Sequence, residues 1–129
     1  MEPYGPFHEL CGPMYATRRD GRTVVGMHTQ EKHRNKGQMV HGGMIFMLLD
    51  NAMTHACSQL RMEGHTMLTT AFSSEVISAA GIGAWIEAEV EVLKAGRRVV
   101  FANTVIRRDG PGGRLIARGS ATFTVLPLK

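Results

Sequence analysis

Cysteine is scarce in this chain, with two residues, Cys11 and Cys57, among 129. Two cysteines do not make the disulfide framework of a small secreted domain, so we expect both to be free thiols in a reducing compartment. Residues 1–6 contain neither a basic patch nor an apolar run, which does not match a signal peptide. The longest apolar run, 44–49, is far too short to span a bilayer. These absences favour a cytoplasmic protein without a membrane segment.

Aromatic residues are also few, at 6% of the chain, while the formal net charge is +4. The basic residues are scattered, with doublets only at 18–19, 97–98 and 107–108. Proteins that bind nucleic acid usually present a dense basic stripe interleaved with aromatic side chains. The sequence therefore argues against a nucleic-acid partner, while its positive charge is compatible with a smaller anionic ligand.

Motifs of several common site classes are missing. The six histidines include no pair at i, i+4, and only two cysteines accompany them, so we expect no metal site. No glycine-rich dinucleotide or P-loop pattern occurs, which argues against nucleotide cofactors of those classes, and we expect no cofactor. The Ser73-Ser74 pair has no Gly-x-Ser-x-Gly elbow around it, so a serine hydrolase triad is unsupported.

The length fits one domain over residues 1–129. Residues 1–12 indicate a loose or briefly helical lead-in, and the polar stretch 30–40 indicates a loop. A long helix is expected from about Gly43 to Met62, ended by Gly64. The strands are expected over 13–17, 23–29, 67–77, 85–92, 98–107 and 115–126, with an Asp-Gly turn between the first two.

Three patterns indicate how these elements pack. The helix is apolar nearly all round over 44–49, so it should be covered on more than one side. Residues 85–92 alternate strictly between a polar and an apolar face, as in a sheet with one dry side. Ala117, Gly119 and Ala121 share one face of the last strand and leave room for a close helix. We therefore predict an α+β fold, a curved antiparallel sheet wrapped around a central helix.

Two glycines stand where that helix is expected to begin. Helix starts usually carry Ser, Thr, Asp or Asn, whose side chains satisfy the free backbone N–H groups. With Gly42 and Gly43 there instead, we expect bare N–H donors that could stabilise an oxyanion. The alternative is a tight turn with no chemical role. His41, just before them, is either a catalytic base or, as we favour, a residue that orients the loop.

Asp50 lies about two turns further along the same helix, among Met, Leu and Phe residues. Aspartate is a poor helix former and is costly to bury. A carboxylate held near a carbonyl group and a water molecule can act as general base or as nucleophile, and the sequence does not choose between these routes. The alternative is a structural carboxylate that hydrogen-bonds neighbours such as Thr54.

A motif around these residues resembles that of a known family, the hotdog-fold acyl-CoA thioesterases of the PaaI-like type. The residues that carry the resemblance are Asn35, His41-Gly42-Gly43 and Asp50-Asn51-Ala52. The likeness extends from about residue 23 to residue 124 and includes the turn at 93–98. The resemblance implies a hotdog fold, which agrees with the packing predicted above, and hydrolysis of an acyl-CoA to a free acid and CoA.

The resemblance also implies roles for individual residues. Asp50 matches the base or nucleophile of the family, and the backbone N–H of Gly42 matches the donor that polarises the thioester carbonyl, with Gly43 shaping the turn. The other matched residues, which hold the thioester or place the attacking water, are Asn35, His41 and Thr69, or Thr70 if the register slips by one. In the family these groups come from two subunits, which implies a homodimer, and we expect a homotetramer.

Coenzyme A carries phosphates at one end, and basic turn residues could hold them outside the acyl pocket. Lys94, Arg97 and Arg98 share one expected turn and are the candidates, although solvated turn charges are an equal alternative. Two other functions remain open: a non-catalytic acyl-CoA binder or sensor, and a hotdog hydratase. The buried carboxylate argues against the first, and the absence of an Asp-x-Asn-x-x-His pattern argues against the second.

Overall fold

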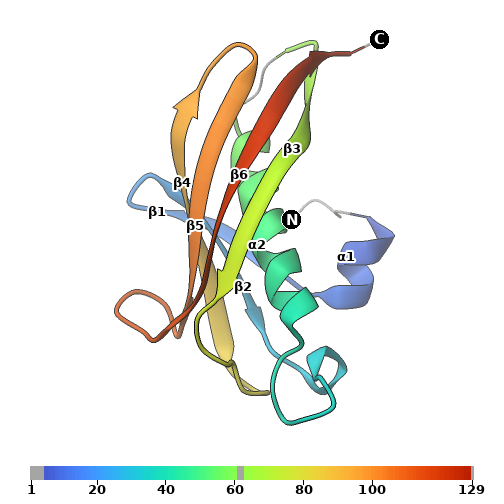
Figure 1. The fold of residues 1–129 in the computed structure, drawn as a ribbon, viewed down its shortest axis with the longest axis vertical. Coiled ribbons are helices and arrows are strands. Elements are labelled where there is room, and N and C mark those ends of the chain that lie inside the picture. Colours follow the sequence, from blue (N-terminus) through green and yellow to red (C-terminus); the bar gives the residue numbers. More distant parts are fainter. Residues whose placement is uncertain (1–4, 61–62, 129) are drawn as a thin grey trace.

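The computed structural model describes residues 5–60 and 63–128. They form one six-stranded sheet with a long helix against one of its faces (Figure 1). In chain order the elements are α1 (Pro6–Cys11), β1 (Tyr15–Arg19), β2 (Arg22–His28), the 3-10 turn η1 (Glu31–His33), α2 (Gly42–Ser58), β3 (His65–Val76), β4 (Trp85–Ala95), β5 (Val99–Arg108) and β6 (Leu115–Pro127).

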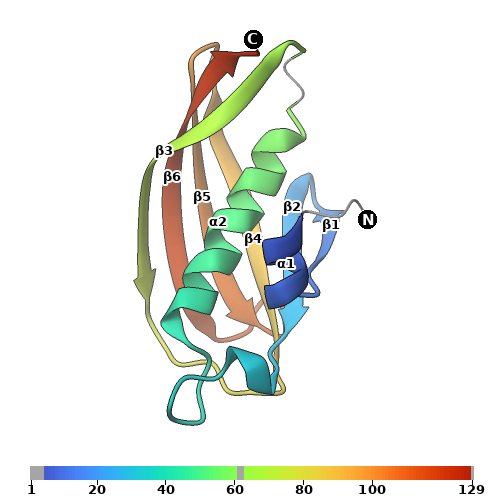
Figure 2. The ribbon, with the colours of Figure 1, turned by 90° about the vertical axis from the view of Figure 1, so that its right-hand side faces the viewer.

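All neighbouring strands are antiparallel, in the order β1-β2-β4-β5-β6-β3. Figure 2 shows α2 crossing one face of the curved sheet. The predicted arrangement of a sheet around a central helix is therefore confirmed. The strand that follows the helix does not pair with the next strand in the chain but lies beside β6, at the far edge.

The predicted strand faces are confirmed by burial. On β4 the alternating residues Ile86, Ala88 and Val90 are buried, whereas the glutamates between them are not. On β6, a methyl group at Gly119 would lie 3.5 Å from Leu49 Cδ1 of α2. The small residues of the last strand therefore do allow the helix to pack closely.

The first hairpin is tighter than predicted. Its strands meet at a two-residue loop in which Asp20 and Gly21 have φ angles of 53° and 77°, the conformation of a type I′ turn. Because this turn uses so few residues, Arg18 and Arg19 join the ladder. The first strand covers 15–19 rather than the expected 13–17.

The helix differs from its prediction at both ends. It begins at Gly42 rather than Gly43, and it ends at Ser58 rather than Met62, which lies outside the described residues. At the C-terminal end the N–H groups of Gln59 and Leu60 turn back to carbonyls three residues earlier. This tightened last turn ends α2 well before Gly64.

The apolar stretch of α2 is covered over most of its circumference but not all round. Leu48 and Leu49 are fully buried against the sheet, but Phe46, two residues before Leu48 and so about 160° away from it around the helix, is 38% exposed. The edge strand β3 is also largely exposed, and on its α2 side Phe72 and Val76 are open to solvent. One chain therefore leaves an apolar surface uncovered along α2 and β3.

Candidate functional site

His41 caps the start of α2 with its own side chain. Its Nδ1 atom accepts a hydrogen bond from the Gly43 N–H at 2.8 Å, and its carbonyl accepts from Met44 and Ile45. Among residues 5–60 and 63–128, the Gly42 N–H has no hydrogen-bond acceptor. The expectation of bare donors at both glycines is wrong for Gly43, because the imidazole occupies its N–H, and it holds for Gly42.

The bond to Gly43 fixes the chemical form of the imidazole. An Nδ1 atom that accepts from a backbone N–H carries no proton, so the proton of His41 lies on Nε2. The ring is exposed and presents this Nε2–H outward. A methyl group at Gly43 would lie 3.0 Å from Nδ1, so glycine suits the close approach of the ring. This arrangement agrees with an orienting or donating role for His41 rather than that of a base.

A buried histidine, His33, links the start of α2 to the end of α1. Its Nδ1 accepts from the Gln30 N–H at 2.9 Å, so its Nε2–H donates to the Cys11 carbonyl at 2.5 Å. Its own carbonyl accepts from the His41 N–H at 2.8 Å. Sequence reasoning missed this residue, since a lone histidine in a polar loop gives no periodic signal.

Asn35 shapes the loop that leads to the helix. Its Oδ1 accepts from the Gly37 N–H at 2.7 Å, and its N–H donates to the Met39 carbonyl at 2.9 Å. Such an Asx turn leaves the side-chain NH₂ group available as a donor on an exposed loop.

Asp50 is half-buried on the third turn of α2. Burial raises the pKa of its carboxyl above the ordinary value, and the charge of His8 acts in the opposite direction. No hydrogen bond joins it to Thr54 within the part of the chain that the structure describes. Asp50 is thus a carboxylate without a structural hydrogen bond there, and burial makes it a stronger base than an exposed aspartate.

Gly42 and Asp50 are eight residues apart on one helix, which separates them by roughly 12 Å along its axis. A thioester carbonyl and the water that attacks it are only about 3 Å apart. One chain therefore places its free N–H and its carboxylate well apart along α2.

A bulge in β3 separates the two candidate threonines. Thr69 pairs with the buried Phe123, which places it on the face of the sheet that carries α2. Thr70, at the bulge, donates from Oγ1 to the Thr122 carbonyl at 3.1 Å and lies near the Thr124 hydroxyl, on the opposite face. Of the two, Thr69 lies on the same side of the sheet as Asp50.

The basic candidates lie at the opposite end of the molecule from the start of α2. Lys94 is the last residue but one of β4, and Arg97 and Arg98 lie in the turn into β5. Figure 1 shows this turn beyond the C-terminal end of the helix. All three residues are exposed. Within one chain the structure does not bring them near Gly42.

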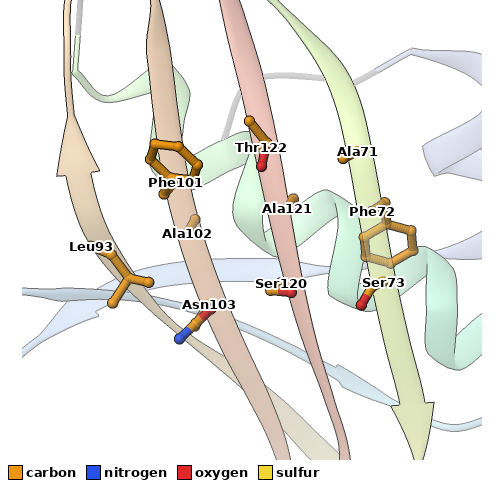
Figure 3. Close-up of a pocket in the computed structure, with 10 residues that line it drawn as sticks. All are labelled: Ala71, Phe72, Ser73, Leu93, Phe101, Ala102, Asn103, Ser120, Ala121 and Thr122. Atoms are coloured by element: carbon orange, nitrogen blue, oxygen red, sulfur yellow. The ribbon is translucent and has the colours of Figure 1, made fainter.

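A hollow of about 310 Å³ lies on the open face of the sheet, away from α2 (Figure 3). Phe101 and Leu93, both exposed, contribute to its apolar lining. The sheet separates it from Asp50, so it does not belong to the same site. Within the described ranges no three His, Cys, Asp or Glu side chains cluster as metal ligands, and no helix is long and apolar enough to cross a membrane.

The curved antiparallel sheet around α2 defines a hotdog fold, with Gly42 and Gly43 at the start of its helix and the half-buried Asp50 within it. Residues 37–114 match the Thioesterase superfamily, and the chain belongs to this family. It is 32% identical over 120 residues, 92% of this chain and 87% of the relative, to a "Putative esterase" of Pseudomonas aeruginosa. By its fold and relatives it is a thioester hydrolase.

Two further comparisons extend this result. Acyl-coenzyme A thioesterase 13 of Homo sapiens is 29% identical over 104 residues, which cover 79% of this chain and 71% of the human protein. The PaaI protein of the E. coli phenylacetic acid degradation operon has the same fold, with a TM-score of 0.81 at 19% identity, covering 95% of this chain and 87% of that one. The predicted hotdog fold and the predicted membership of a thioesterase family are confirmed.

Proposed function

We propose that this protein hydrolyses acyl-CoA thioesters at a site made by two copies of the chain, with Asp50 of one copy facing Gly42 of the other. The observation that carries the proposal is the half-buried carboxylate of Asp50, which has no structural hydrogen bond within the described residues. The likeness to an acyl-coenzyme A thioesterase supports the choice of CoA as the thiol.

In the first route, Asp50 is a general base. A water molecule attacks the thioester carbonyl carbon while Asp50 accepts one of its protons. The negative charge that develops on the carbonyl oxygen is stabilised by the Gly42 N–H at the positive end of α2. The C–S bond then breaks, the proton passes to the departing thiolate, and the products are a carboxylic acid and CoA. Thr69, the Asn35 amide and the His41 Nε2–H supply hydrogen bonds that place the water and the thioester.

In the second route, Asp50 is a nucleophile. Its oxygen attacks the carbonyl carbon, CoA leaves as the thiolate, and water hydrolyses the resulting mixed anhydride. A single turnover in ¹⁸O-labelled water separates the routes. When water attacks the mixed anhydride at the Asp50 carboxyl carbon, ¹⁸O remains in Asp50. The general-base route places ¹⁸O only in the carboxylic acid product.

The two-copy site has a physical basis in the separation of Gly42 and Asp50 along α2. The exposed edge strand β3 and the exposed side of α2, including Phe46, offer the apolar surface for a dimer. If α2 of the partner runs in the opposite direction, its N-terminal end lies beside Asp50. The same antiparallel packing brings the partner's basic turn, with Arg97 and Arg98, toward the Gly42 end of this chain. The hollow at Phe101 and Leu93 is the surface for pairing two dimers into a tetramer.

The test is release of free thiol from a panel of acyl-CoAs that includes aromatic and aliphatic acyl groups. Asp50→Asn should lower turnover at least ~100-fold, the loss typical of a missing general base. Asp109→Asn makes the same chemical change in an exposed loop and should retain full activity. Near-normal turnover in Asp50→Asn would refute the role of Asp50. Tight acyl-CoA binding without thiol release would instead identify a binding or sensing protein.

A further inference from the structure

The segment 33–41, between η1 and α2, forms a small antiparallel hairpin. Its two arms meet at an antiparallel bridge in the middle. On one side of this bridge, the Asn35 N–H donates to the Met39 carbonyl at 2.9 Å. On the other side, the His41 N–H donates to the His33 carbonyl at 2.8 Å. Asn35 and His41, which carry two of the candidate donors, therefore lie on opposite arms of one hairpin.

His33 stands at the base of the first arm, and its side chain attaches that arm to the rest of the protein. The residue is only 4% exposed. Its Nδ1 accepts from the Gln30 N–H at 2.9 Å, and its Nε2–H donates to the Cys11 carbonyl at the end of α1. The second arm is held separately, by the Val40 N–H that donates to the Ala80 carbonyl at 2.8 Å. A buried ring with both nitrogens bonded is held in one orientation.

We propose that His33 is a positioning residue for the reaction, whose buried ring fixes the 33–41 hairpin and so places the donors of Asn35 and His41 at the start of α2. The inference rests on the proposed function, since His33 acts through these donors and not on the substrate itself.

The hydrogen bonds give the ring a short route to the site. The His33 carbonyl holds the His41 N–H, and the His41 ring caps α2 by accepting from the Gly43 N–H at 2.8 Å. Asn35 follows His33 by two residues on the same arm. Groups that act on a reacting centre must be held to within about 0.5 Å, and a misplacement of about 1 Å can cost ~100-fold in rate. A shift at the base of the hairpin should therefore lower turnover while α2 stays folded.

The first readout is amide hydrogen exchange followed by NMR, without substrate. In His33→Ala, the amides of Asn35 and His41 should exchange faster, and their increase should exceed that of Leu48, buried in the middle of α2, by at least about tenfold. The matched control is His65→Ala, which removes an exposed histidine whose Nδ1 contacts the Glu63 carbonyl. It should leave the exchange of the hairpin amides unchanged.

The second readout is turnover of an acyl-CoA in combined variants. His33→Ala alone should lower kcat about tenfold or more and change KM less, because the donors act in the transition state. Added to Asn35→Ala with His41→Ala, it should cost little more, since the donors through which it acts are already gone. Added to Thr69→Ala, on β3, it should cost its full amount. Equal losses in both backgrounds would assign His33 a general structural role and overturn the inference.

A conservative variant guards against loss of folding. In His33→Asn the Oδ1 atom can still accept from the Gln30 N–H, so this variant should lie between wild type and His33→Ala in both readouts. Exchange of the His41 amide that is the same in wild type and both variants, or that rises only as much as that of Leu48, would overturn the inference. Because exchange needs no substrate, it decides whether the ring holds the hairpin even if no acyl-CoA is hydrolysed.

Discussion

His41 Nδ1 and the Gly43 N–H form a 2.8 Å hydrogen bond that closes the first turn of α2. The same ring therefore caps the helix with one nitrogen and presents a donor with the other. These two roles can be separated by substitution, because an asparagine side chain can cap a helix but has no imidazole Nε2–H.

We expect His41→Ala to lose the cap and about 1 kcal/mol of stability. His41→Asn should retain the cap and unfold at nearly the wild-type temperature. If the Nε2–H contacts the substrate, both variants should lose turnover to a similar extent. Thermal unfolding and steady-state kinetics on the same samples check this. Full activity in His41→Asn would reduce the role of the ring to capping.

Asp50 should make the folded protein less stable at neutral pH. Because burial raises its pKa above the ordinary 3.8, the folded state favours the neutral carboxyl. This contribution to stability is fully present below the unfolded pKa and is lost as the pH rises through the folded pKa. Asparagine is always neutral, so Asp50→Asn should be more stable than wild type at pH 7. Denaturant titrations should show this difference shrinking as the pH approaches 3.8.

The two-copy site predicts complementation between inactive variants. Gly42→Pro removes the free N–H at a helix position that tolerates proline, and His41 already has the extended backbone that must precede one, with φ −59° and ψ 135°. Gly42→Pro and Asp50→Asn should each be nearly inactive alone. After unfolding and refolding together, random dimers should recover about a quarter of wild-type activity, because half are mixed and each has one intact site. No recovery from well-folded mixed dimers would place both groups in the same chain.

The exposed edge predicts how assembly can be broken. Val76→Lys places a charge on the α2 side of β3, where it would repel a second copy. We expect light scattering to report monomers and activity to be lost. Leu93→Lys, on the open face of the sheet, should leave an active dimer and prevent only the tetramer. Active wild-type monomers at micromolar concentration would rule out the two-copy site.

The basic turn predicts a difference between full and truncated substrates. Arg97→Ala with Arg98→Ala should raise KM for acyl-CoA more than it lowers kcat, because these residues would contact only the nucleotide end. The effect should shrink with a pantetheine thioester and at high salt. Equal losses with both substrates would show that the turn does not contact the phosphates of CoA.

Much of the fold could be predicted because local patterns and tertiary packing agree. The alternation of buried and open residues on β4 and the Asp-Gly turn each indicate one structure, and that structure forms. The small residue at Gly119 predicted the close approach of the helix. The position of β3 next to β6 could not be predicted, since both of its faces are largely exposed and its sequence gives no clear period.

The sequence singles out the residues of the candidate site but says less about their hydrogen bonds. Asp50 is conspicuous because a carboxylate in an apolar helix is costly, and Gly42 because it stands at a helix start. The cap from His41 could not be foreseen, since histidine is not a usual N-cap residue. His33 acts through a contact between segments distant in the sequence, which no local pattern encodes.

The pairing of β3 with β6 also has a consequence for the order in which the chain folds. Residues paired between these strands are 41 to 62 positions apart, from Val76 with Ala117 to His65 with Pro127. The hairpin of β4 with β5 closes over far shorter loops. Because loop-closure entropy grows with separation, β3 should join its own sheet late. The strand that offers its free edge to a second copy is thus the one that joins its own sheet last, so a second copy can pair with this edge only after the rest of the chain has folded.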